Sequence, residues 1–274
     1  MTQSSSTLCF IGGGNMARSL IGGLLQRGMT AEQIRVAEPV EAARQALGEQ
    51  LQVQCFADNL EAASGADCVI LAVKPQVMKT VCAGFQAFAG TPLWISIAAG
   101  ITNAQLDSWL GGGQRIVRSM PNTPALLGAG ASGLVANARC SASDRALAEQ
   151  VLSAVGIAVW IGDEAQMDAV TALSGSGPAY SFLLAEAMQN AAVKQGLDAE
   201  AARQLTAQTL LGAARMLTES AESASTLRSR VTSPGGTTQA AIESLQAGGF
   251  ESLVGQAIAA ATRRGSELSA AAGN

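Results

Sequence analysis

Histidine is absent from this chain of 274 residues, and aromatic and charged residues make up only 4% and 14% of it. The absence argues against dehydrogenases that move an alcohol proton with a histidine, and against histidine-ligated zinc sites. The cysteines are scattered and form no C-x-x-C pair, so we expect buried, reduced thiols and no metal site. They are Cys9, Cys55, Cys68, Cys82 and Cys140.

Positive charge and long apolar runs are scarce as well. The net charge is −4 and no basic stripe occurs, so we expect no nucleic-acid partner. Apolar runs such as "CVILAV" and "LWISIAA" are much shorter than the ~20 residues that cross a bilayer, so we expect no membrane partner. The first residues, "MTQSSST", contain neither the positively charged segment nor the long apolar segment of a secretory signal. We therefore expect a cytoplasmic protein.

Short apolar segments do alternate with helical stretches through the first part of the chain. This alternation predicts an α/β fold with a Rossmann-type, mostly parallel sheet and crossover helices. Strand-like segments are expected at residues 7–12, 33–39, 53–58, 67–73, 92–99, 115–122, 130–137 and 157–162. We place the end of this first domain at residue 162, so that it spans residues 1–162.

The remaining residues, 163–274, read as helices only. Pro178 suits a first helical turn, Gly196 suits the position after a helix end, and Asp198 suits an N-cap. The apolar stripes on these helices are broader than a small isolated bundle would bury, which favours packing against another copy of the chain.

A glycine-rich turn follows the first predicted strand. "FIGGGNMA" supplies G-x-G-x-x-A through Gly12, Gly14 and Ala17, the pattern that binds a dinucleotide pyrophosphate at a helix N-terminus. Glu38 ends the second predicted strand, where a carboxylate can accept from a ribose 2′-hydroxyl and favour NADH. Arg35 and Arg44 are close in sequence and could instead receive a 2′-phosphate, so the choice between NADH and NADPH stays open.

A second glycine-rich loop, "TSPGGTTQAA" at 232–241, precedes a helical pattern in the other half of the chain. Backbone N–H groups at such a place can hold an anion. The alternative interpretation is an ordinary turn with a threonine N-cap. Between the two glycine loops, Lys74 in "LAVKP" and the small residues of "SIAAG" follow strands and could line a cofactor; a solvent-exposed Lys74 is the alternative.

The motifs "FIGGGNMA", "LAVKPQ", "SIAAGIT", "MPNTPA", "DAVTALSGSGPAY" and "TSPGGTT" occur in the order found in pyrroline-5-carboxylate reductases, which the chain resembles over nearly its whole length. The resemblance implies an enzyme of proline biosynthesis with an N-terminal Rossmann domain and an all-helical C-terminal dimerisation and substrate domain. It also implies NADPH or NADH as cofactor, pyrroline-5-carboxylate as substrate, active sites completed by the neighbouring subunit of a homodimer, and in many members rings of dimers.

The resemblance also implies the residues of the site. Besides Arg35, the cofactor residues would be Gly12, Gly13, Gly14, Asn15, Met16, Glu38, Pro39, Asn59, Ala72, Val73, Lys74, Pro75, Ala98, Ala99, Gly100 and Asn122. The substrate residues would be Val231, Ser233, Gly235, Gly236, Thr237, Thr238, Glu164, Ser176, Gly177 and Pro178, with Thr238 as the catalytic one. Family members often carry a glutamate before the substrate loop; Glu219 and Glu222 are both out of register with it, so we leave that role unassigned.

The residues themselves favour a reaction that needs little acid–base help. The helical segment after "SGSGP" lacks the lysine that β-hydroxyacid dehydrogenases use, since Lys194 lies about four turns beyond Pro178. A protonated cyclic imine is already a strong hydride acceptor, and its carboxylate would be the handle for the "SPGGTT" loop. Two alternatives stay open: another imine or keto-acid reductase of the same plan, or a dinucleotide-sensing regulatory protein.

Overall fold

The structure is a computed structural model that describes residues 6–272, so most of the segment inspected for a secretory signal lies outside the described residues. All eight predicted strands are present and each lies within or next to its predicted segment. They are β1 (Leu8–Ile11), β2 (Ile34–Ala37), β3 (Gln54–Phe56), β4 (Cys68–Leu71), β5 (Leu93–Ser96), β6 (Arg115–Met120), β7 (Gly130–Ala136) and β8 (Gly156–Trp160).

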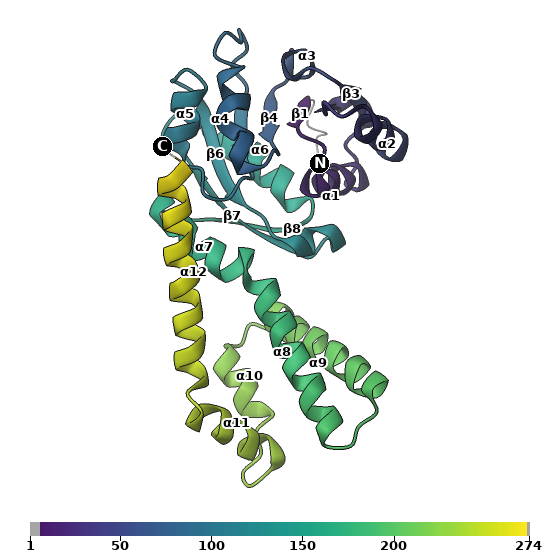
Figure 1. Ribbon diagram of the computed structural model, residues 1–274, viewed down its shortest axis with the longest axis vertical. Helices are drawn as coiled ribbons and strands as arrows, with labels where there is room; N and C mark the ends of the chain where they lie inside the picture. Colours follow the sequence, from purple (N-terminus) through teal and green to yellow (C-terminus); the bar gives the residue numbers. More distant parts are fainter. Residues whose placement is uncertain (1–5, 273–274) are drawn as a thin grey trace. The chain divides into compact units, whose positions relative to one another are not determined.

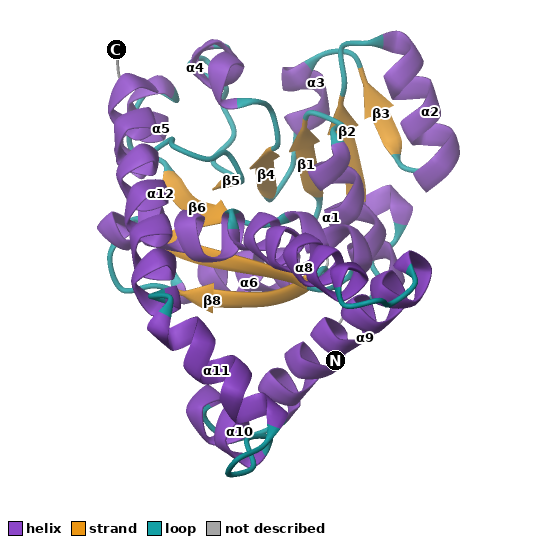
Figure 2. Ribbon diagram, turned by 60° about the horizontal axis from the view of Figure 1, so that its bottom comes forward, coloured by secondary structure: helices purple, strands orange, loops and turns teal. Residues whose placement is uncertain are grey.

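The strands form one sheet in the order β3-β2-β1-β4-β5-β6-β7-β8. The first six are parallel, and their order is that of a dinucleotide-binding sheet. β7 runs antiparallel to β6, with Met120 opposite Gly133, and β8 is parallel to β7. The predicted fold class, with a mostly parallel sheet, is confirmed (Figure 2).

Helices cover both faces of this sheet, as the right-handed crossovers between parallel strands require. The helices of this part are α1 (Asn15–Gln26), α2 (Glu41–Leu51), α3 (Asn59–Ala63), α4 (Pro75–Ala83), α5 (Asn103–Trp109) and α6 (Ala142–Ser153), with short turns η1 (Ala31–Gln33) and η2 (Thr123–Leu127). One buried cluster joins α1, α2 and α6 to one face, and a second joins α3, α4 and α5 to the other.

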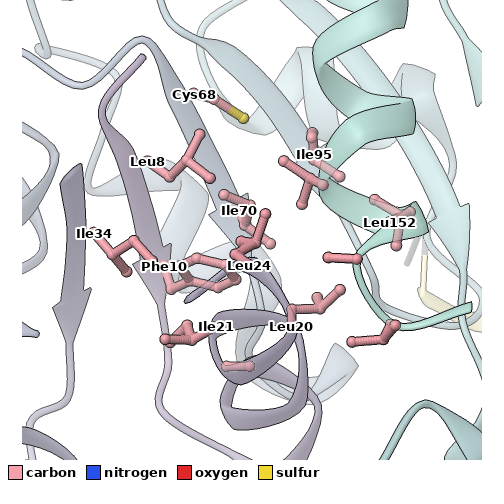
Figure 3. Packing of buried hydrophobic residues seen from close by; sticks show 14 of the residues in the cluster. Leu8, Phe10, Leu20, Ile21, Leu24, Ile34, Cys68, Ile70, Ile95 and Leu152 are labelled. Atoms are coloured by element: carbon pink, nitrogen blue, oxygen red, sulfur yellow. The ribbon is translucent and has the colours of Figure 1, made fainter. Parts of the chain in front are cut away.

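The cluster beneath α1 shows how the sequence pattern produces this packing. In Figure 3, Phe10 of β1 lies beside Ile21 and Leu24 of α1, and Leu8 and Leu20 belong to the same buried cluster. Alternate residues of the strand point to this face, and the helical residues recur at the three- and four-residue spacing of one helix side. Each of these side chains is at most 3% exposed, so α1 and the turn before it are held firmly against the sheet.

The chain after β8 is helical, as predicted, but its first helix is interrupted. A turn η3 (Glu164–Gln166), a short helix α7 (Met167–Val170) and a π-helical turn η4 (Thr171–Gly175) come before α8 (Gly177–Lys194). The sequence pattern does not reveal the π-helical turn, because a single i→i+5 turn barely disturbs apolar periodicity. The other helices are α9 (Ala199–Glu219), α10 (Ala224–Arg230), α11 (Thr237–Ala247) and α12 (Phe250–Ala272).

Local signals at these helix ends are confirmed. Pro178 lies in the first turn of α8, Gly196 has a φ of +98°, and the Asp198 side chain caps α9 by accepting from the Ala201 N–H. At α6 the N-cap is Ser141, in a capping box with Asp144.

The chain forms two compact units. One extends to Ser176 and includes the chain again from Ala260 onward; the other comprises Gly177–Ala259 (Figure 1). The return of the last segment is visible in its contacts, since the Gln105 side chain donates to the Ser269 carbonyl. The domain boundary predicted at 162/163 coincides with the end of the α/β pattern and stays a prediction.

Candidate active site

The turn between β1 and α1 has the geometry of a pyrophosphate cradle. Gly12 has a φ of +102°, and a Cβ there would lie 2.8 Å from the Ala72 carbonyl oxygen, so only glycine fits. A Cβ on Gly13 would lie 2.6 Å from a Leu47 methyl. Gly14 is the N-cap of α1 and has no side chain to occupy the free N–H groups of the first turn. The turn has the shape and the free N–H groups that an anionic pyrophosphate requires, and pyrophosphate binding there stays a prediction.

Glu38 lies beside this cradle. Its carboxylate accepts from the Gly13 N–H at 3.2 Å and from the Val40 N–H at 3.1 Å. The Arg44 guanidinium donates to the Glu38 carbonyl at 2.8 Å, and thus faces the backbone rather than the carboxylate. A carboxylate at this place favours a ribose hydroxyl and opposes a 2′-phosphate.

Arg35 occupies a different position from the one its proposed role requires. It lies within β2, two residues before the strand's end, and its guanidinium donates to the Ser64 carbonyl. Ligands of such sheets collect beyond the carboxyl ends of the strands. The assignment of Arg35 to a cofactor phosphate stays a prediction without a supporting contact.

The carboxyl ends of the other parallel strands place the remaining cofactor candidates at the same edge. Ala72 and Val73 follow β4 and border Gly12, Lys74 is the N-cap of α4, and Pro75 is its first residue. The segment after β5 is short of side-chain bulk, with Ala98 buried and Gly100 at a φ of +74°. The other candidates lie on helix starts or loops of this unit: Asn15, Met16, Pro39, Asn59 and Ala99.

Glu164 is already engaged within the first unit. One of its carboxylate oxygens accepts from the Asn103 N–H at 2.8 Å and from the buried Arg118 side chain at 3.1 Å. It is 29% exposed and ties the start of α5 to β6. A substrate role for Glu164 stays a prediction, and these two contacts assign it a structural role that its sequence position did not indicate.

The second glycine loop lies in the helical unit and opens α11. Gly235 has a φ of +69° and donates to the Gln239 side chain, and Gly236 is the N-cap. Because Gly236 offers no capping side chain, the N–H groups of Thr237 and Thr238 point out of the helix end uncapped. The alternative of a threonine N-cap is therefore wrong, since both threonines lie inside the helix.

The absence of a side-chain cap distinguishes α1 and α11 from several other helices. α5, α6, α9 and α10 begin with Thr102, Ser141, Asp198 and Ser223, whose side chains accept from their own first turns. Glycine at the N-cap leaves those N–H groups available to an anion instead. This was visible in the sequence as a G-x-G or G-G before an apolar helical pattern.

The surroundings of the second loop leave the family's glutamate role unassigned. Glu222 pairs with Arg230 at 2.5 Å and Glu219 with Arg215 at 2.7 Å. Val231, proposed beside the loop, is the exposed C-cap of α10. Ser233 and Gly235 are exposed, and Thr238 is half-buried; Ser176, Gly177 and Pro178, also half-buried, begin α8 or immediately precede it. In the part of the chain that the structure describes, no helix could span a membrane and no metal-binding cluster occurs.

The sheet order and the cradle define a dinucleotide-binding fold. A family model described as an NADP oxidoreductase, coenzyme F420-dependent, matches residues 7–100, and one described as pyrroline-5-carboxylate reductase dimerisation matches residues 164–268. A pyrroline-5-carboxylate reductase of Pseudomonas aeruginosa is 54% identical, covering 97% of this chain and 98% of the relative. The chain belongs to the pyrroline-5-carboxylate reductase family.

Two solved structures agree with this assignment. A pyrroline-5-carboxylate reductase from Coxiella burnetii superposes with a TM-score of 0.94 at 44% identity, covering 97% of this chain and 99% of the other. A Plasmodium falciparum pyrroline carboxylate reductase with NADP bound gives 0.84 at 29% identity, covering 97% and 98%. The similarity therefore extends over both units.

Proposed function

We propose that this protein reduces 1-pyrroline-5-carboxylate to L-proline with NADPH or NADH. The single observation that carries the proposal is the pair of glycine-capped helix starts, one in each unit, in a chain of this family. One suits a dinucleotide pyrophosphate and the other a small carboxylate. Another imine or keto-acid reductase would share the dinucleotide cradle at α1. A nucleotide sensor would not need the carboxylate site at α11.

In this proposal the substrate carboxylate binds the Thr237 and Thr238 N–H groups at the start of α11. The charge is stabilised there by uncapped N–H groups and by the helix dipole. Gly235 and Gly236 allow the ligand to approach the backbone closely. The Thr238 hydroxyl has no hydrogen-bond partner among the described residues, and it is free to meet the ring nitrogen directly or through water.

Bound NAD(P)H supplies the hydride that the imine carbon accepts. The chain's own contribution is positioning, since Gly12 to Met16 would hold the pyrophosphate and the small residues Ala98 to Gly100 would leave room for a flat ring. A protonated imine becomes an amine on accepting a hydride, so no histidine is required. This agrees with a chain that has none.

The helical unit suits a homodimer, as the dimerisation family model implies. We extend the proposal to rings of dimers, which the family resemblance implies. We also propose a cytoplasmic enzyme, because NAD(P)H and five unpaired cysteines both fit a reducing compartment.

The test is NADPH oxidation, followed by absorbance, with pyrroline-5-carboxylate and separately with 2-keto acids. Thr238→Ala should lower kcat about 5- to 30-fold, because one transition-state hydrogen bond of about 1–2 kcal/mol is lost. Thr218→Ala is the control, since that exposed hydroxyl bonds only carbonyls of its own helix. Oxidation with keto acids alone, or unchanged kinetics for Thr238→Ala, would contradict the substrate or the role of Thr238, respectively.

A further inference from the structure

Asn122 uses both ends of its side-chain amide inside the protein. Its Oδ1 accepts from the Ala131 N–H at 2.9 Å, and its Nδ2 donates to the Ser174 carbonyl at 3.0 Å. The side chain is 9% exposed. Asn122 is the second residue after β6, separated from it by Pro121. Continuing the β6–β7 register past Met120 and Gly133 would place Asn122 opposite Ala131. The amide thus replaces a ladder hydrogen bond of the strand pair.

The bond from Asn122 to the Ser174 carbonyl replaces a backbone hydrogen bond that the π-helical turn lacks. In an α-helix the Ser174 carbonyl would accept from residue 178, but that residue is proline and has no N–H. The turn is instead closed by an i→i+5 bond, from the Ser176 N–H to the Thr171 carbonyl at 2.8 Å. Asn122 supplies the missing donor to Ser174, and the neighbouring Gly175 packs on Met120, whose methyl would lie 2.7 Å from a Cβ there.

We propose that Asn122 is a positioning residue that fixes the π-helical turn 171–175, and with it Ser176, to the cofactor edge of the sheet. The inference rests on the proposed function, and on the family resemblance that assigns Ser176 to Pro178 to the substrate and the ends of the parallel strands to the cofactor. Asn122 is only 9% exposed and has a protein partner at each polar end of its amide, so most of its surface is already used inside the protein. Turns of the π type are frequent at functional sites, where they redirect a side chain or a carbonyl.

The chain contains a matched control at the other end of the same strand pair. Asn137 directly follows β7, and Asn122 is the second residue after β6. Its Oδ1 accepts from the Ile116 N–H at 3.3 Å and its Nδ2 donates to the Gln114 carbonyl at 2.8 Å. Both asparagines accept a backbone N–H and donate to a backbone carbonyl across the strand ends. Asn137 Oδ1 accepts in addition from the Arg139 N–H and the Cys140 thiol, and Asn137 has no bond to the π-helical turn.

The experiment compares Asn122→Asp with Asn137→Asp in the full-length protein. Each change keeps an acceptor oxygen, removes the amide donor and adds a negative charge, so both variants should lose thermal stability. We expect Asn122→Asp to lower kcat with pyrroline-5-carboxylate about 10- to 100-fold while the Kd for NADPH stays within about twofold. Asn137→Asp should keep kcat within about twofold of the parent value.

Hydrogen exchange of the peptide covering 171–178 is the second readout, and it does not depend on activity. It should accelerate in Asn122→Asp and stay unchanged in Asn137→Asp. Equal kcat values for the two variants, equal exchange, or a loss of NADPH affinity as large as the loss of kcat/KM would each overturn the proposal. If the parent protein does not reduce pyrroline-5-carboxylate, the proposed function fails, and exchange still decides the role of Asn122. If Asn122→Asp does not fold, Asn122→Ser replaces it.

Discussion

The two units of the chain differ in how much of their own apolar surface they bury. In the α/β unit, every strand from β4 to β6 has a fully buried centre. Each helix from α1 to α6 contributes side chains to one of two buried clusters. In residues 177–259 only Ala202 and Thr206 are buried. Large side chains in this unit are exposed instead, among them Phe182 at 69%, Leu183 at 67% and Leu205 at 58%.

This difference indicates that the α/β unit folds around its own core, whereas the helical unit needs another copy of the chain. Monomeric proteins rarely leave such a density of large apolar side chains in water, and the family model matching this region is one for dimerisation. The helical unit also carries the proposed substrate loop. Assembly, substrate binding and turnover should therefore be lost together, while coenzyme binding by the α/β unit persists.

The largest expected effect comes from charging the exposed face of α8. Phe182→Asp should give a monomer with no measurable turnover, because burying an unpaired carboxylate in an apolar interface costs several kcal/mol. Light scattering measures the mass, and fluorescence titration should show an NADPH affinity close to that of the parent. Val77→Asp, at a 47% exposed site of α4, is the control and should stay dimeric and active. A dimeric, active Phe182→Asp would break the comparison between the units.

Substitutions that shorten one apolar side chain in each unit test the same difference with a smaller expected effect. Ile70→Ala removes a fully buried side chain of β4 and should lower the free energy of unfolding by about 2–5 kcal/mol. Leu211→Ala, at a 54% exposed position of α9, should leave the concentration-independent part of the stability nearly unchanged and weaken the dimer. Urea unfolding at several protein concentrations separates the two effects. A concentration-independent loss of similar size for both variants would contradict the proposed difference.

Coenzyme choice should follow the α/β unit alone. Glu38→Ser removes a carboxylate that accepts from the Gly13 N–H beside the cradle. We expect the kcat/KM ratio for NADPH over NADH to rise about three- to tenfold, because about 1 kcal/mol of repulsion toward a 2′-phosphate disappears. The gain should shrink at high salt. An unchanged ratio would mean that the carboxylate does not face the ribose.

Features that a local pattern determines could be predicted, and features that depend on distant contacts could not. Gly12 and Gly14 were identifiable because a tight turn and an uncapped helix start restrict the residue type. Asn122 was assigned to the cofactor, and nothing near it in the sequence revealed the bond to Ser174. Likewise, nothing in the sequence of α12 shows that its last part belongs to the α/β unit. That membership depends on contacts with distant residues, such as the bond from Gln105 to Ser269.

The cysteines provide the mildest test, since all five lie in the α/β unit and report on its integrity alone. Burial raises the pKa of the Cys9 thiol to about 12, although the nearby Arg35 charge opposes the shift, and burial alone raises the pKa of Cys82 to about 12. The thiolate is the reactive form, so these thiols should react slowly with a disulfide reagent at pH 8 until urea unfolds the chain.

The sign of the shift fixes how this protection depends on pH. A raised pKa means that the folded state keeps neutral thiols, so their contribution to stability is complete below about pH 9 and is lost as the pH rises toward 12. Labelling of Phe182→Asp should be as slow as labelling of the parent, because losing the dimer leaves the α/β core closed. Fast labelling of Cys9 and Cys82 in that variant would mean that the α/β unit also depends on assembly, and the contrast between the two units would fail.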